Sequence, residues 1–101
     1  GGLTDFVTAA GWLLKNGGRF GVVYLAERLA ELFVRMVAAG IEPKRLRIVH
    51  PRKHEAAKMV LVEGRKNGRP GLSVETPLYV YKGAGRDYSD EVLSMYENPS
   101  D

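Results

Sequence analysis

The sequence predicts an α/β fold, in which the strands of one sheet alternate with helices along the chain. Three observations lead to this fold class. A helical apolar repeat occupies residues 3–15, an unbroken apolar run fills residues 19–25, and a second helical repeat covers residues 26–40. A strand, a helix and a further parallel strand form a right-handed crossover unit. At 101 residues, the chain has room for one domain with a small core.

The first helix is predicted from apolar residues at helical spacing, which are Phe6, Ala9, Ala10, Leu13 and Leu14. Thr4 or Asp5 is expected to cap its first turn. Gly17 or Gly18 is expected to end it in the left-handed conformation.

The second helix carries the clearer apolar stripe, made by Leu29, Leu32, Phe33, Met36 and Val37. Gly40 is well placed to end it, and Pro43 prevents it from resuming.

The strands differ in their patterns. Residues 19–25 do not alternate, which predicts a strand covered on both faces. Residues 44–50 alternate, which predicts one wet face and a place near a sheet edge. Residues 56–64 read as a more central, returning strand, and residues 78–81 as a short one.

The last predicted element is a short helix over residues 88–97. Ser89 is a good N-cap, and Asp90 and Glu91 suit the positive start of a helix. Val92, Leu93 and Tyr96 are expected to face inward.

Composition excludes several classes of protein. Cysteine is absent, so disulfides, thiol catalysis and thiolate metal sites are excluded. No apolar run approaches the roughly 20 residues that span a bilayer, and no export leader opens the sequence. We therefore expect a cytoplasmic protein that does not enter membranes. The net charge of +3 and the sequence pI of about 9.3 suit nucleic acid, and equally a surface kept basic for solubility.

The sequence offers no catalytic or metal constellation of its own. Gly17 and Gly18 precede a strand, whereas a phosphate-binding loop follows one. His50 and His54 lie in a predicted loop with no third ligand implied, so we expect no metal site. No serine, threonine or carboxylate pair stands in a catalytic setting, so we expect no catalytic residue in this chain.

The basic residues fall into clusters that the topology separates. If residues 44–50 run parallel to residues 19–25, the loop with Arg52 and Lys53 reaches the edge where residue 25 ends. Ligands of open α/β sheets bind at that carboxyl edge. The cluster of Arg65, Lys66 and Arg69 is expected at the opposite edge.

Three stretches together resemble a known family: "LLKNGGRF", "AERLAELFVRMVAAGIEPKRLRIVHPR" and "MVLVEGRKNGRPGL". They resemble the C-terminal part of bacterial class I S-adenosylmethionine-dependent methyltransferases of the small-domain group, which modify N6 of adenine 37 in tRNA1(Val). The first stretch is common to many methyltransferases, and "VHPR" followed by "LVEGRKNGRPGL" is far more specific. The likeness continues through "PLYVY" and "YSDEVLSMYE".

The resemblance implies a fold: the C-terminal half of a Rossmann-like methyltransferase sheet, with strands five, six and an antiparallel strand seven, and flanking helices. Strand seven lies between strands five and six in this family. Residues 1–72 would form this half-domain, and residues 73–101 a C-terminal extension with a short strand and a helix.

The family's chemistry lies in motifs that this sequence does not contain. These are a glycine-rich cofactor loop, an acidic residue after the second strand, and an Asn-Pro-Pro-aromatic motif that holds the target adenine. The one Asn-Pro here, Asn98-Pro99, has no second proline. The resemblance therefore implies a fragment that is inactive alone and does not bind S-adenosylmethionine, whereas the full-length parent uses that cofactor.

The resemblance also implies what this half contributes, which is a rim facing tRNA. The residues expected there are Tyr24, Glu27, His50, Arg52, Lys53 and His54. Arg52 and Lys53 would hold phosphates. Tyr24 would stack near a base or, equally, pack as a half-buried tyrosine at a strand end.

Two further expectations concern partners. Strand 19–25 would lack its usual neighbour in such a fragment, so we expect self-association through this unpaired edge, as in a symmetric dimer. The alternative to the enzyme reading is a stand-alone α/β module that binds RNA through its basic loops, or an assembly module.

Overall fold

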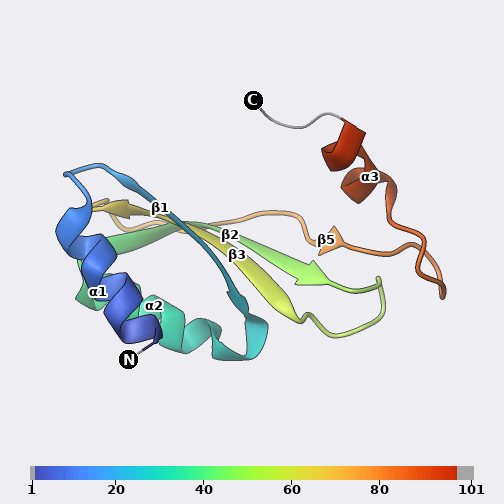
Figure 1. Ribbon diagram of the computed structural model, residues 1–101, viewed down its shortest axis with the longest axis horizontal. Helices are drawn as coiled ribbons and strands as arrows, with labels where there is room; N and C mark the ends of the chain where they lie inside the picture. The colour runs from blue at the N-terminus through green and yellow to red at the C-terminus, as the bar shows by residue number, and fades with distance from the viewer. Residues whose placement is uncertain (1, 98–101) are drawn as a thin grey trace.

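The computed structural model, which describes residues 2–97, combines helices with one β-sheet (Figure 1). The elements, in chain order, are α1 (Leu3–Leu13), β1 (Arg19–Leu25), the 3₁₀ helix η1 (Ala26–Arg28), α2 (Leu29–Ala38), β2 (Ile41–His50), β3 (Met59–Lys66), β4 (Ser73–Val74), β5 (Leu78–Tyr79) and α3 (Asp90–Glu97). The α/β fold class is confirmed.

The sheet has the strand order β1-β3-β2-β4. β3 is antiparallel to both of its neighbours, so β1 and β2 are parallel to each other. Leu25, Met59 and Val49 form one row across these strands, so β1 and β2 end at the same edge. The predicted central, returning strand and the parallel crossover through α2 are both confirmed.

β2 is longer and better covered than the alternation predicts. It begins at Ile41, and a bulge between Pro43 and Arg45 accommodates the proline, which has no N–H to donate. β4 and β5 both pair with β2 in parallel. The expectation of an edge position is therefore wrong along part of β2, because the C-terminal segment returns beside it.

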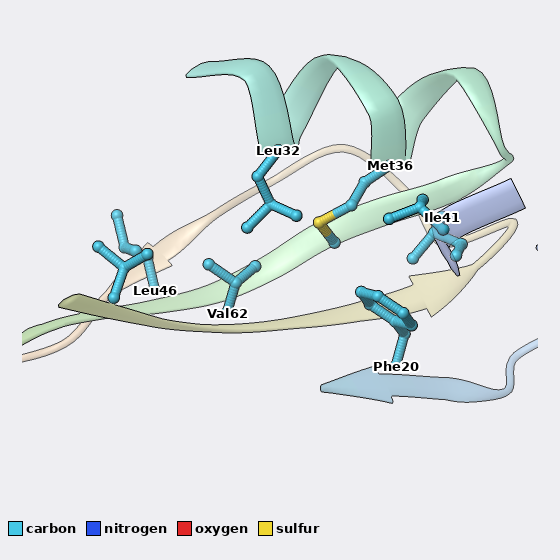
Figure 2. Close-up of a cluster of buried hydrophobic side chains, with 8 residues drawn as sticks. Phe20, Leu32, Met36, Ile41, Leu46 and Val62 are labelled. Atoms are coloured by element: carbon cyan, nitrogen blue, oxygen red, sulfur yellow. The ribbon is translucent and has the colours of Figure 1, made fainter. Parts of the chain in front are cut away.

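The core lies between α2 and the sheet (Figure 2). Leu32 and Met36 point from α2 onto the strands and are fully buried. They meet side chains from all three long strands, among them Phe20, Leu46 and Val62. The predicted stripe of α2 is confirmed except for Val37, which is 56% exposed.

The buried side of α1 differs from the prediction. Val7 and Gly11 are buried and Leu3, Ala10 and Leu14 pack on the core, whereas Phe6 and Leu13 are exposed. Gly11 explains the shift, because it lets α1 approach α2 closely: a Cβ built there would lie 2.5 Å from the Ala39 carbonyl oxygen. The predicted cap is also wrong, since the N-cap is Gly2 and no side chain caps it.

The prediction that a left-handed glycine ends the helix is confirmed for α2, where Gly40 follows the C-cap Ala39. It is wrong for α1, which ends at Leu13 with an extended C-cap at Leu14, so Gly17 lies in the turn before β1. Gly17 has a φ of 79° and Gly40 a φ of 77°. L side chains rarely adopt this left-handed conformation, so these turns favour glycine. Gly40 leads directly into β2, which fixes the short crossover from α2.

β1 is covered on one face only, which corrects the expectation of two covered faces. Phe20, Val22 and Tyr24 face the core, whereas Val23 and Leu25 are 59% and 41% exposed. α1 and α2 both lie on the same side of the sheet (Figure 1). Within residues 2–97, no strand pairs with the outer edge of β1.

α3 lies beyond β5, away from the other two helices (Figure 1). The predicted cap is confirmed, because Ser89 Oγ accepts a hydrogen bond from the Val92 N–H at 3.3 Å. The inward stripe is wrong for Leu93 and Tyr96, which are exposed. The reason is that α3 packs mainly on the two-residue strand β5, and an ion pair joins Glu91 in its first turn to Arg47.

Candidate functional site

The carboxyl ends of β1 and β2 meet at a loop formed by residues 51–58. The Lys58 N–H donates to the Val49 carbonyl at 3.1 Å, and the Ala26 N–H donates to the Lys58 carbonyl at 3.0 Å. These bonds join the end of β1 to the loop after β2. The structure thus places the predicted site residues at one edge of the sheet.

His50, at the end of β2, helps to hold this loop in shape. Its Nδ1 lies 2.7 Å from the Glu55 carbonyl oxygen. Because a carbonyl only accepts hydrogen bonds, Nδ1 carries the proton. The ring also contacts Tyr79, with centroids 5.6 Å apart.

Arg52 is the most constrained side chain of the loop. Its guanidinium donates to the Glu55 carboxylate at 3.1 Å and to the Gly85 carbonyl at 2.6 Å. It also lies over the Tyr81 ring, 4.9 Å from the centroid. The side chain is 25% exposed, and its Nε is buried with no hydrogen-bond partner among the described residues. Arg52 is therefore a cation fixed in position before any ligand arrives.

Lys53 and His54 follow on the same loop and are exposed. Neither side chain has a hydrogen bond or ion pair with another residue in the part of the chain that the structure describes. Their nitrogen atoms are available to a ligand.

Tyr24 and Glu27 stand at the other side of this edge. Tyr24 is half-buried and packs on the core, and Arg28 lies over its ring at 5.4 Å. This matches a packed strand-end tyrosine. Glu27 is exposed in η1. Hydrogen bonds to Glu31 hold Arg28 in place, and these bonds raise the pKa of Arg28.

The C-terminal segment supplies a part of the site that the sequence pattern did not reveal. Residues 80–89 fold back as a hairpin, in which the Lys82 N–H donates to the Asp87 carbonyl and the Ser89 N–H to the Val80 carbonyl. The Tyr81 and Tyr88 rings stack in this hairpin at 5.6 Å. Tyrosines at positions 79, 81 and 88 beside Lys82 were the available signal, since interleaved aromatic and basic residues are typical of nucleic-acid surfaces.

The loop and the hairpin enclose a pocket of about 860 Å³. Arg52, Lys53 and His54 line it from the loop, and Tyr79, Tyr81 and Lys82 from the C-terminal segment. Tyr24 and Glu27 do not line it. The structure thus places four of the six predicted residues at the end of β2 and in the loop that follows it, namely His50, Arg52, Lys53 and His54. Tyr24 of β1 and Glu27 of η1 lie beside this loop.

The second basic cluster lies at the opposite edge, as expected, and the side chains of Arg65 and Lys66 bond to other parts of the fold. Lys66 Nζ donates to the Gly11 carbonyl at 2.6 Å and to the Ala39 carbonyl at 3.3 Å. Arg65 donates to the Gly17 carbonyl. These bonds satisfy carbonyls at the ends of α1 and α2 and in the turn before β1.

Two features are absent from residues 2–97. No group of three or more histidine, aspartate or glutamate side chains is arranged to hold a metal ion there. None of the helices in this range has the length and apolar character needed to cross a membrane.

Comparison with known proteins identifies the fold. No protein-family model matches the chain, and no curated protein does. Among solved structures, the chain is similar to a predicted O-methyltransferase, Atu636, from Agrobacterium tumefaciens. The TM-score is 0.83 at 20% sequence identity, over 94% of this chain and 45% of that protein. The chain spans less than half the length of this neighbour, and its sheet and flanking helices have the Rossmann-like fold of the matched part of that structure.

Proposed function

We propose that this chain is the C-terminal half of an S-adenosylmethionine-dependent methyltransferase that modifies N6 of adenine in RNA, with tRNA as its substrate. One observation carries the proposal: antiparallel β3 lies between the parallel strands β1 and β2. This is the arrangement of the last three strands that the family resemblance implies. The fold similarity to part of a methyltransferase supports the same placement.

The role proposed for this half is to form the substrate-side rim. His50, Arg52, Lys53 and His54 lie on or beside one loop at the carboxyl edge of parallel strands, where ligands of α/β sheets bind. Lys53 and Arg52 would contact phosphates, a sequence-independent interaction. Tyr24 and Glu27 would border the rim from the end of β1.

The residues present do not fit S-adenosylmethionine. The glycine pair Gly17-Gly18 precedes β1, whereas the family's cofactor loop follows its first strand. The Asn-Pro-Pro-aromatic motif is also absent from the sequence. The 101-residue chain is therefore proposed to be inactive alone, and the cofactor and the reacting groups belong to the remainder of the proposed enzyme.

A methyl-transfer assay tests this proposal. The complete product of the source gene is incubated with isotopically labelled S-adenosylmethionine and unmodified tRNA, and the RNA is then digested to nucleosides. The expected product is N6-methyladenosine, formed by the complete protein and not by the 101-residue chain. Label on a ribose or another hydroxyl would contradict the adenine-N6 assignment and favour transfer to oxygen, which the name of the Agrobacterium protein describes.

The alternative is a stand-alone α/β module that binds RNA without chemistry, or an assembly module. The exposed nitrogen atoms of Lys53 and His54 suit the RNA-binding form of this alternative as well as they suit an enzyme's rim. RNA binding by the complete gene product, together with an absence of methyl transfer to any tRNA, would favour the module.

A further inference from the structure

The pocket between the 51–55 loop and the 80–89 hairpin has the size and the walls of a ligand site. Its volume of about 860 Å³ lies within the range of small-molecule and cofactor pockets. Tyr79 and Tyr81 contribute aromatic side chains to the pocket lining, and Ser89 and Asp90 contribute polar ones. Such a pocket has more room than a phosphate ion needs and suits a planar, partly polar ligand.

The charges of the pocket favour an anion at one side. Lys53 and Lys82 are exposed and have no side-chain partner among residues 2–97. Arg52 is held between Glu55, Gly85 and the Tyr81 ring, and its buried Nε has no partner. A cation that is already fixed binds an anion with little loss of side-chain entropy.

The carboxylates of the lining show why a phosphate alone is a poor match. Glu55 is paired with Arg52, whereas Asp90 has no ion pair or side-chain hydrogen bond with the described residues. An unpaired carboxylate repels phosphate but accepts hydrogen bonds from exocyclic amines, which adenine, guanine and cytosine carry. These features together match a nucleotide. The tyrosines suit its base, the lysines suit its phosphate, and the carboxylate of Asp90 suits an exocyclic amine of the base.

We propose that this pocket binds one unpaired nucleotide of an RNA strand. Its base would lie against the Tyr79 and Tyr81 side of the pocket, and its phosphate near Lys53 and Lys82. The inference rests on the proposed function for the choice of RNA. It extends that function by giving the C-terminal segment a direct role, that of holding a nucleotide next to the modified adenine.

The test uses the 101-residue chain and a fluorescein-labelled, single-stranded octaadenylate RNA, with binding followed by fluorescence anisotropy. Tyr79→Leu removes the ring but keeps an apolar side chain, and Lys82→Ala removes an exposed charge. Trp12→Leu and Lys15→Ala are the matched controls, since both residues are exposed and lie outside the pocket. An amide correlation NMR spectrum of each variant checks that the fold is retained.

The expected result is binding that the two pocket variants impair and the two controls do not. Tyr79→Leu should weaken affinity by about five- to 150-fold, the range for loss of one base–aromatic stack. Lys82→Ala should reduce the salt dependence, the slope of log K against log salt, by about 0.7. Adenosine 5′-monophosphate should shift the amide resonances of residues 52–55 and 79–90. If the Tyr79→Leu variant does not fold, the Lys82→Ala variant and the nucleotide titration still test whether the pocket binds a nucleotide.

Several outcomes would overturn the proposal. These are no RNA binding at millimolar chain concentration, equal losses in the controls, or nucleotide shifts confined to other residues. Binding of the free nucleotide as tightly as the octamer would assign the pocket to a metabolite. Equal competition by an acidic octapeptide would assign it to charge alone. The methyl-transfer assay stands apart: N6-methyladenosine without pocket binding removes only this inference, and pocket binding without methyl transfer removes only the proposed enzyme.

Discussion

Lys66 shows how a single basic side chain can serve the fold instead of a ligand. Its ammonium group reaches from β3 to carbonyl oxygens of Gly11 and Ala39, at the C-terminal ends of α1 and α2. Helix C-terminal carbonyls have no partner within the helix, and the helix dipole adds attraction for a cation. The sequence placed Lys66 in a basic cluster without revealing this role, because its partners are 55 and 27 residues away.

We predict that Lys66→Met lowers the free energy of unfolding by about 1–2 kcal/mol, because it leaves a part-buried carbonyl unsatisfied. Urea unfolding followed by circular dichroism measures this effect. Lys15→Met is the matched control, since Lys15 is exposed. Equal midpoints for the two variants would show that the bonds of Lys66 contribute nothing.

A second residue-scale prediction concerns Arg52 and Lys53. If both contact phosphates, the double alanine variant of the complete protein should bind tRNA more weakly and with a flatter salt dependence. Each lost contact should reduce the slope of log K against log salt by roughly 0.7–0.9. Filter binding between 50 and 200 mM salt measures the slope, and an unchanged slope would remove both residues from the RNA interface.

At the scale of elements, the contact between α1 and α2 depends on Gly11. The close approach of its backbone to Ala39 leaves no space for a methyl group. Gly11→Ala should therefore destabilise the protein by about 1–3 kcal/mol through overpacking, although alanine favours the helix by up to about 1 kcal/mol. Thermal unfolding measures it against Gly21→Ala, where a Cβ meets no atom within 4 Å. A stabilised Gly11→Ala variant would contradict the observed packing.

An ion network joins β2, β3 and the segment after β4. Arg45 contacts Glu63 at 2.9 Å and Glu75 at 2.8 Å. The hydrogen bond from Arg45, and then its charge, lower the pKa of Glu75 below the ordinary value of 4.5. A depressed folded-state pKa contributes stability that is present above pH 4.5 and is lost as pH falls through the folded-state pKa.

We therefore predict that Glu75→Gln is less stable than the original chain at neutral pH, and that the difference disappears as pH falls below 4.5. The effect should be small, because both partners are partly exposed and water screens the pair. Urea midpoints measured from pH 7 to pH 3 give the difference. A constant difference over that range would mean that the carboxylate charge of Glu75 does not stabilise the fold.

The helices and strands also show which buried faces the spacing of apolar residues can predict. The stripe of α2 and the central place of β3 followed from apolar spacing alone, because the core dominates both elements. The stripe of α1 was misplaced, because its buried side is set by a glycine contact rather than by apolar residues. The stripe of α3 was misplaced, because that helix packs mainly on β5, a strand of only two residues, and Leu93 and Tyr96 stay exposed.

The part of the site that follows from strand topology was predictable from the sequence. The part that depends on a distant segment folding back against the loop was not. Because the sequence predicted that β1 and β2 are parallel, it also predicted that His50 and Arg52 lie at the carboxyl edge of the sheet. The partners of Arg52 at Gly85 and Tyr81 belong to a hairpin about 30 residues later. No local pattern connects the two segments, so the pocket itself appeared only in the structure.

At the scale of the whole molecule, the sheet exposes apolar surface on the side opposite α1 and α2. Val23 and Leu25 of β1 are exposed, and β1 has no strand on its outer edge within residues 2–97. An unpaired, apolar edge strand favours pairing with another chain. Self-association through strand 19–25 stays a prediction.

Light scattering coupled to size exclusion tests it. The 101-residue chain should form a dimer whose fraction rises with concentration, and Val23→Lys should shift the population to monomer, because a charge on an edge strand opposes pairing. Thr8→Lys, at an exposed position of α1, is a charge-matched control. A chain that stays monomeric at high concentration would contradict this prediction.

The measurement that tests the central claim most directly is the sequence of the source gene upstream of the Gly1 codon. A methyltransferase half predicts that the reading frame continues for about 150 residues, one more domain's worth. That segment should contain a glycine-rich loop after its first strand and an Asn-Pro-Pro-aromatic motif. A start codon at or near Gly1 would contradict the enzyme assignment and make an RNA-binding or assembly module the better account.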